Sequence, residues 1–185
     1  YKVLNGIHFG VPQKRQRVFI VSVRNDVLDN IGMPWMLISS LFPEGADEEP
    51  TLEDAIGDLR LDNENRVEAE ELIAAMKKSA KWKWMKRLPK NPDRVVSVGD
   101  DAVGPWYDKV IAHRKKWGKS IPERKHSFYQ SRRVPWHQAS HTLSEQGLQT
   151  SLAVHLHAEE DRVYTTKEAK RIMTLPEDYL SLIHI

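Results

Sequence analysis

A glutamine and two arginines recur at alternate positions just after a tight turn near the start of the chain. The turn is the GVP sequence at residues 10–12, and the side chains are Gln13, Arg15 and Arg17. Because successive side chains of an extended segment point to opposite sides, these three should emerge on one side. They would form a ledge rich in hydrogen-bond donors. The alternative is an exposed strand with surface charges.

A strongly basic block follows an acidic one along the chain. Residues 44–71 hold 12 acidic and two basic side chains, whereas residues 77–133 hold 17 basic and five acidic side chains, interleaved with tryptophans. Each phosphate that a cation neutralises releases counterions and so strengthens binding. The basic block therefore predicts a surface for a polyanion such as nucleic acid, with a solvated helical face as the alternative.

The chain contains no cysteine, which excludes disulfides, thiolate metal ligands and a cysteine nucleophile within its 185 residues. His155 and His157 alternate on an extended segment and could join His137 or His141 at a metal ion. No carboxylate stands at ligand spacing, so we expect no metal site. The apolar runs are far shorter than the ~20 residues that span a bilayer, and nothing marks a secretory signal, so we expect no membrane association.

Two short strands are predicted around the GVP turn, the second of them within residues 18–21. An isolated hairpin is marginal in water, so these strands need a larger sheet to pair with. An irregular connection is expected over residues 26–49, and a helix should begin at Thr51 with Asp54 three residues on.

The longest helix is predicted over residues 65–88, where Pro89 stops it. Short strands and loops are expected over residues 94–135, and a β return over residues 142–156. Thr165 then opens a last helix with Glu168 in a capping box, and Pro176 should end it.

Residues 4–21, LNGIHFGVPQKRQRVFIV, resemble the GVPQxRxR motif of cytosine-5 DNA methyltransferases, including the strand on each side. Residues 162–179 resemble the later RxLTxREAARLQxFPDxY motif of that family, with Lys170, Met173 and Leu175 as departures.

Two shorter segments between these motifs also resemble the family. Residues 51–59 are similar to the TVRDAIGDL helix that leads into its target-recognition region. The Thr-Leu pair that begins at Thr142 resembles the pair typical of that region, and its weight comes from standing about twenty residues before Arg162.

The resemblance implies roles for individual residues. Arg17 would hold a flipped cytosine at its carbonyl oxygen, with Gln13 and Arg15 beside it as part of the catalytic site. Thr142 would contact the backbone near the flipped nucleotide. Glu168 and Arg171 would be structural, organising the recognition domain against the catalytic one.

Further DNA contacts are expected from the basic block. Arg132 and Arg133 stand where a bidentate contact to guanine in the major groove is expected, with phosphate contact as the alternative. Lys83 and Lys86 are expected at DNA as well.

The implied architecture is α/β. Residues 1–59 and 160–185 would be a remnant of a Rossmann-like S-adenosylmethionine-dependent methyltransferase sheet, and residues 60–159 an inserted, smaller target-recognition domain. The chain starts at Tyr1 and lacks the cysteine that the family's reaction needs. We therefore expect the C-terminal part of a longer enzyme, inactive alone, whose missing N-terminal part binds S-adenosyl-L-methionine.

The implied function is transfer of a methyl group to carbon 5 of a flipped cytosine in a specific double-stranded DNA sequence. The enzyme would be a monomer in the cytoplasm, encoded by a prokaryote or a phage. Two alternatives remain: a stand-alone DNA-binding specificity module that acts with a separate catalytic chain, and a transfer RNA cytosine-5 methyltransferase.

Overall fold

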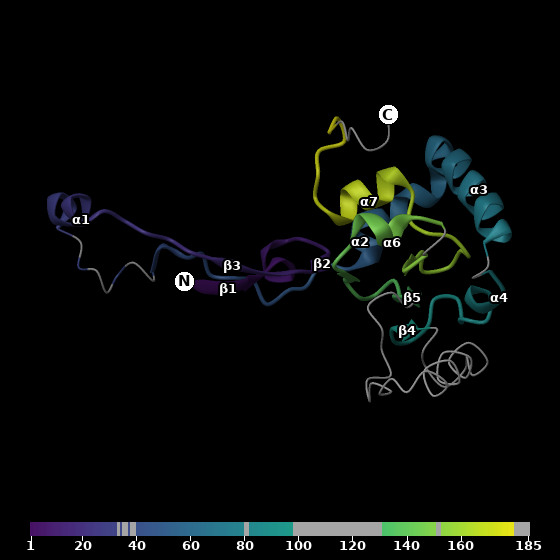
Figure 1. Ribbon diagram of the computed structural model, residues 1–185, viewed down its shortest axis with the longest axis horizontal. Coiled ribbons are helices and arrows are strands. Elements are labelled where there is room, and N and C mark those ends of the chain that lie inside the picture. Colours follow the sequence, from purple (N-terminus) through teal and green to yellow (C-terminus); the bar gives the residue numbers. More distant parts are fainter. Residues whose placement is uncertain are drawn as a thin grey trace, which may run out of the picture.

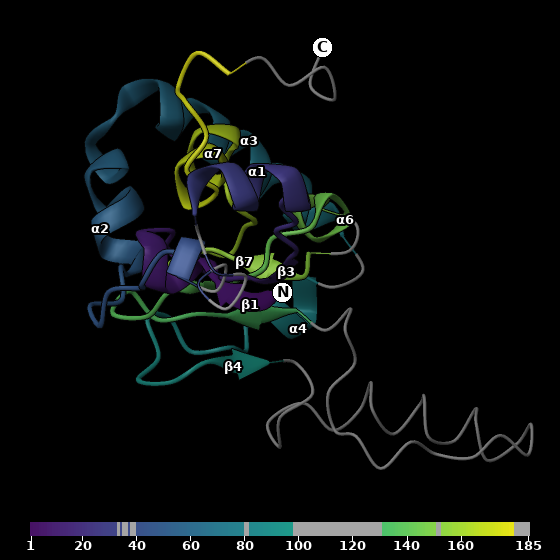
Figure 2. The same cartoon turned by 90° about the vertical axis from the view of Figure 1, so that its left-hand side faces the viewer.

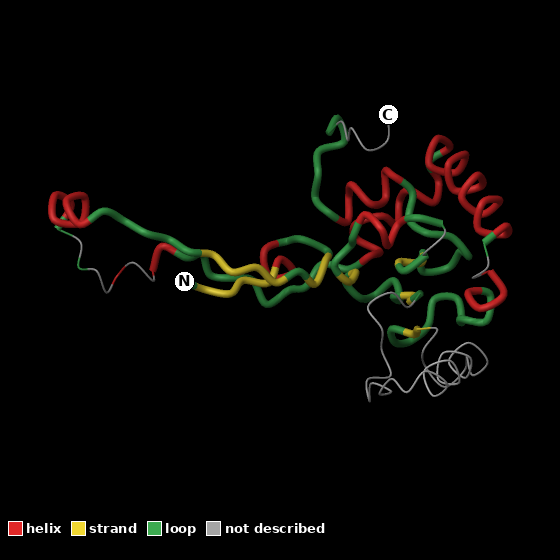
Figure 3. Tube along the Cα trace, viewed as in Figure 1, coloured by secondary structure: helices red, strands yellow, loops and turns green. Residues whose placement is uncertain are grey.

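A slender N-terminal arm projects from a larger body in the computed structural model (Figure 1). A view turned by 90° looks along this arm toward the body (Figure 2). The body is mainly helical and its strands are short (Figure 3). The structure describes residues 1–32, 34, 37, 40–79, 82–97, 131–150 and 153–179.

The arm is built on an antiparallel pair of strands, as the sequence predicts. β1 (Lys2–Asn5) pairs with β3 (Gln16–Phe19) in a register that runs from Lys2↔Phe19 to Asn5↔Gln16. The connection is longer than a tight turn, because it contains the 3-10 helix η1 (Gly6–Phe9). Gly10 ends η1 with a φ of 79°, a left-handed conformation that glycine adopts without a steric cost.

The end of this connection joins the arm to the body. β2 (Gln13–Lys14) pairs in parallel with β6 (Ser140–His141), with Gln13 opposite Ser140 and Lys14 opposite His141. The backbone amide of Ser140 also donates to the Pro12 carbonyl at 3.0 Å.

A short helix lies at the far tip of the arm, within the segment predicted to be irregular. α1 covers Asn25–Ile31 and ends at Gly32, whose φ is 61°. Arg24 at its N-cap makes no side-chain capping bond, so the usual start signal is missing. The prediction of an irregular connection over residues 26–49 is therefore wrong for residues 26–31.

Both predicted capping boxes are present. Thr51 caps α2 (Leu52–Ile56) with Asp54, and α2 continues into the 3-10 helix η3 (Gly57–Leu61). Thr165 caps α7 (Thr166–Ile172) with Glu168, although α7 ends before Pro176 is reached.

The single long helix predicted over residues 65–88 is two helices. α3 covers Asn63–Lys78 and is capped by Asp62, whose side chain accepts from the Asn65 amide. α4 covers only Trp82–Met85.

The body contains a small three-stranded sheet in the order β4 (Val96–Ser97), β5 (Arg132–Arg133) and β7 (His155–Leu156). β5 is antiparallel to β4 and parallel to β7. The predicted β return over residues 142–156 is only partly strand, because α6 (Glu145–Leu148) lies within it.

The core of the body joins segments that are distant in the sequence. One cluster packs α2, η3 and α7 against the segment before and after β6, and a second packs α3 and α4 against β7. The fold is thus a mixture of helices and small sheets. No described helix has the length and apolar character needed to cross a membrane. The buried members of the first cluster are Leu52, Ile56, Leu59, Val134, Trp136, Leu143, Ala158, Tyr164, Ala169 and Ile172.

Candidate nucleic-acid interface

The three alternating side chains of the GVP segment border one groove, as their spacing predicts. Gln13, Arg15 and Arg17 line a hollow of about 580 Å³ whose remaining walls are mostly apolar. Arg17 is exposed and its Nη1 donates to the Gln16 carbonyl at 2.8 Å. Gln13 is 1% exposed and its Nε2 has no hydrogen-bond partner. Met173, from the segment after α7, also lines this groove, so both long motifs meet there.

Thr142 lies directly against the GVP segment. Its Oγ1 donates to the Lys14 carbonyl at 2.8 Å, across 128 positions of sequence. This bond extends the β2–β6 pairing by one residue. The Thr142 hydroxyl is therefore held beside the donor ledge, and its oxygen keeps acceptor capacity.

A smaller hollow opens beside Thr142, and we call it the Arg132 pocket. Its volume is about 150 Å³. Cationic and imidazole groups dominate its walls, and none of the lining residues that the structure describes is acidic. The lining residues are Lys14, Arg132, His141, Thr142, Ser144, Val154 and His155.

Arg133 points to the opposite side of β5 and is fully buried. Its Nη2 lies 2.6 Å from Asp161 Oδ1, and its Nη1 donates to the Glu160 carbonyl at 2.7 Å and to the His157 carbonyl. Burial lowers the pKa of Arg133, and the charge of Asp161 opposes this effect. The expectation that Arg133 reads a base does not fit this placement, because its terminal donors are already used inside the fold.

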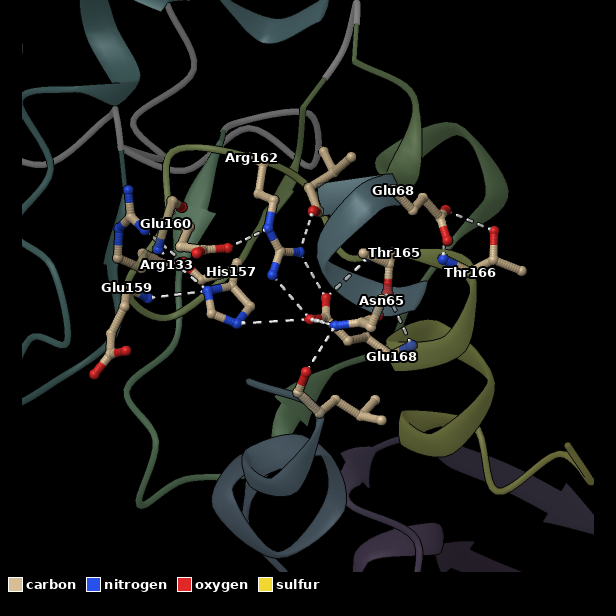
Figure 4. Close-up of polar contacts among 12 residues, drawn as sticks. Asn65, Glu68, Arg133, His157, Glu159, Glu160, Arg162, Thr165, Thr166 and Glu168 are labelled. Carbon is tan, nitrogen blue, oxygen red and sulfur yellow. Dashed lines mark hydrogen bonds and ion pairs between the residues drawn. The ribbon is translucent and has the colours of Figure 1, made fainter. Parts of the chain in front are cut away.

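Glu168 stands at the centre of a buried polar network (Figure 4). Arg162 donates to both carboxylate oxygens, at 2.7 Å and 2.9 Å. The Thr165 amide donates to Oε2 at 2.9 Å, and Asn65 Nδ2 donates to Oε1 at 3.1 Å. Burial alone would raise the pKa of Glu168, but Arg162 and the other donors hold it at about 2.

His157 borders the same network. Its Nδ1 accepts from the amides of Glu159 and Glu160, and its Nε2 lies 3.8 Å from Glu168 Oε1 (Figure 4). Burial, followed by the charge of Arg162, lowers the pKa of His157 to about 3, so the ring is neutral. Sequence reasoning missed Asn65 and His157 as network members, because neither lies in a motif that signals its distant partners.

Arg171 bridges α7 to η3 from a more exposed position. Its Nη1 lies 2.6 Å from both carboxylate oxygens of Asp58, and its Nη2 lies 3.0 Å from Glu177 Oε1. Glu168 and Arg171 thus both make their contacts within the fold.

Several expected DNA contacts fall on parts that the structure leaves undescribed. The side chain of Lys83 and residues 98–130 of the basic block lie outside the described residues, whereas Lys86 is exposed just after α4. Within the described ranges, no group of three histidine, aspartate or glutamate side chains converges as metal ligands would. His155 and His157 do not share a site, because one lines the Arg132 pocket and the other lies in the Glu168 network.

The groove with the donor ledge and the Arg132 pocket lie on either side of the β2–β6 pairing, and Lys14 of that pairing lines the pocket. The family model for C-5 cytosine-specific DNA methylase matches residues 1–182, and the chain belongs to this family.

Curated relatives agree with the family assignment. The chain is 28% identical to type II methyltransferase M.Eco47II of Escherichia coli over 97% of its own length and 38% of the relative's. It is 40% identical to type II methyltransferase M.BspRI of Lysinibacillus sphaericus over 45% of the chain and 19% of that protein. A third match, to type II methyltransferase M.MthTI of Methanothermobacter thermautotrophicus, is 46% identical over 32% of the chain and 15% of the relative. The chain thus spans well under half of these relatives, and no solved structure matches it.

Proposed function

We propose that this chain supplies DNA recognition and part of the cytosine pocket of a DNA cytosine-5 methyltransferase. The observation that carries the proposal is the contact of Thr142 Oγ1 with the Lys14 carbonyl, because it fastens the recognition segment to the donor ledge. A base held at the ledge and a backbone held at Thr142 would belong to one nucleotide.

The chemistry requires that the target cytosine leave the duplex, at a cost of a few kcal/mol that pocket contacts repay. Arg17 is the group proposed to donate to the cytosine carbonyl oxygen. Its guanidinium is exposed, and its Nη1 donates to the neighbouring Gln16 carbonyl. Arg15 and Gln13, which line the same groove, would hold the ledge and the adjoining backbone.

The methyl donor does not fit the groove beside the ledge. Ribose hydroxyls are commonly held by a carboxylate, and the cationic sulfonium of S-adenosyl-L-methionine is repelled by positive charge. Among the described residues, the groove is lined by Arg15 and Arg17 and by no acidic side chain. We place the donor site and the cysteine nucleophile in a further part of the enzyme, so that this chain alone transfers no methyl group.

The arm is proposed to be part of a larger catalytic sheet. Val18, Phe19 and Ile20 are 60%, 48% and 79% exposed, and a lone two-stranded ribbon with such apolar faces is unstable in water. Residues 1–59 and 160–185 would then complete a Rossmann-like catalytic domain, with residues 60–159 as the target-recognition domain. The enzyme would act as a monomer in the cytoplasm of its host.

Double-stranded DNA is the proposed partner of the basic block. Thr142, Arg132, Lys83 and Lys86 would meet the duplex, and affinity should fall steeply with salt, because each phosphate contact releases counterions. A duplex affinity that stays flat between low and physiological salt would contradict this surface.

The function is tested by joining the chain to the rest of its reading frame and mapping methylated cytosines in host DNA by bisulfite sequencing. We expect methylation at one defined sequence, and none from the chain alone. Methylation confined to transfer RNA would replace the DNA substrate by RNA. Activity that needs a second polypeptide would instead favour a specificity module acting in trans.

A further inference from the structure

The Arg132 pocket is built by two strand pairs that each place a cation next to a histidine. Paired residues on neighbouring strands share a face of the sheet. Arg132 is paired with His155 on β5 and β7, and Lys14 is paired with His141 on β2 and β6. All four side chains line the same pocket.

Two polar atoms of this pocket are buried without a partner. Arg132 Nε and His155 Nε2 make no hydrogen bond, and His155 is only 6% exposed. A buried donor without an acceptor is unfavourable, so such an atom in a pocket points to a ligand that would supply the acceptor. Arg132 and Lys14 also repel each other, and no carboxylate among the described side chains lines the pocket. The missing component is an acceptor with negative charge.

The size of the pocket limits the ligand to a compact group. Its volume of about 150 Å³ is well below the roughly 300–1,000 Å³ of ordinary small-molecule sites. A single phosphate group offers several acceptor oxygens to the Arg132 and Lys14 donors. Thr142 already lies against the ledge segment, so such a phosphate would sit beside the base pocket.

We propose that the Arg132 pocket binds one phosphate of a DNA backbone and takes up a proton through its two histidines as it does so. The identity of the ligand as DNA rests on the proposed function, whereas the proton uptake follows from the pocket itself.

Proton uptake is expected because both histidines of the pocket are held neutral when no anion is bound. Burial, then Arg132 and then His141 lower the pKa of His155 to about 4. Burial, then Arg132 and then Lys14 lower the pKa of His141. A phosphate would oppose the field of both cations and favour the protonated rings. By linkage, DNA should then bind more tightly as the pH falls through the raised pKa values of the two rings in the bound state.

The direct test follows the His155 ring resonance of the chain by NMR during acid titration, alone, with a short DNA duplex and with inorganic phosphate. We expect the titration midpoint to move from about 4 to above 5 with the duplex. A midpoint that shifts with inorganic phosphate but not with the duplex would overturn the assignment of the ligand to DNA. An unmoved midpoint while fluorescence anisotropy shows duplex binding would overturn the pocket and leave the proposed function standing. Failure to bind the duplex at all would count against both.

A second measurement uses charge-matched variants and needs no resonance assignment. Arg132→Gln should weaken duplex binding about tenfold and lower the slope of log affinity against log salt by about one, the signature of a lost phosphate contact. Arg66→Gln removes the same charge from an exposed site on α3, within the acidic block, and should change affinity less than about twofold. Equal effects of the two variants would reject a specific phosphate site.

Discussion

Arg162 and Glu168 face each other through two hydrogen bonds in the interior, with Nη1 2.7 Å from Oε2 and Nη2 2.9 Å from Oε1. Their side chains are 3% and 2% exposed. The same carboxylate caps α7 at Thr165 and accepts from Asn65 on α3. One ion pair therefore fixes the direction of α7 against both α3 and the segment before it.

Glu168→Gln should destabilise the fold by about 3–5 kcal/mol, because it removes the buried counter-ion of Arg162 and leaves only Glu160, whose side chain is 44% exposed, beside that charge. Urea unfolding measures the loss, and Glu70→Gln on the exposed face of α3 is the matched control, expected within about 0.5 kcal/mol of the parent. A loss below about 1 kcal/mol for Glu168→Gln would show that the pair is not essential to the fold.

Arg171→Gln should cost no more than about 1 kcal/mol. Its partners Asp58 and Glu177 are 64% and 65% exposed, and water screens such pairs. The same unfolding experiment gives the value. A cost equal to that of Glu168→Gln would mean that the helix junction is more closed than these exposures indicate.

Acid should destabilise the fold through its buried histidines, of which His157 has its pKa lowered furthest and His155 to about 4. The pKa of His157 is lowered to about 3 in the fold, from 6.5 in the unfolded chain, so protons bind the unfolded state more readily. The stabilisation is complete above pH 6.5 and is lost as the pH falls toward 3, reaching a loss of about 2 kcal/mol at pH 5. Glu168 adds a further loss only below pH 4.5, as the pH approaches its folded pKa of about 2.

The check on this assignment is the difference in unfolding free energy between pH 7 and pH 5. His157→Gln should reduce that difference by about 2 kcal/mol, whereas His137→Gln, at an exposed position, should leave it nearly unchanged. If the two variants reduce it equally, the pH dependence does not come from the buried ring.

Gly147→Ala should displace the His155 ring. A Cβ at this position would lie 2.3 Å from His155 Cδ2 and 2.6 Å from its Nε2. We expect a loss of about 1–3 kcal/mol in thermal or urea unfolding. Adding His155→Ala should make the glycine substitution cost much less, and two fully additive losses would contradict a direct clash.

Arg17→Ala in the completed enzyme should slow single-turnover methylation about 30- to 1,000-fold, through a loss of about 2–4 kcal/mol of transition-state stabilisation. Equilibrium binding of the duplex should fall much less, since the contact forms with the flipped base. Arg66→Gln serves again as the control with an equal loss of charge. Parental rates at saturating DNA would remove Arg17 from the cytosine pocket.

Local signals in the sequence predicted the elements that depend on near neighbours. Thr51 with Asp54 and Thr165 with Glu168 mark helix starts because capping bonds span three residues. The alternation of Gln13, Arg15 and Arg17 predicted that they share one side, because every second side chain of an extended segment points the same way. All three line one groove. α1 escaped prediction because its N-cap lacks such a signal.

The sequence by itself determined that a donor ledge, two capped helices and a pair of adjacent arginines exist in this chain. Only the tertiary structure decided between those arginines, since neighbours on a strand face opposite sides. β5 lies between β4 and β7, and this position sends Arg133 into the core toward Asp161 and Arg132 into the pocket with His155. That choice depends on strand pairings across more than twenty residues, which no local pattern of side chains records.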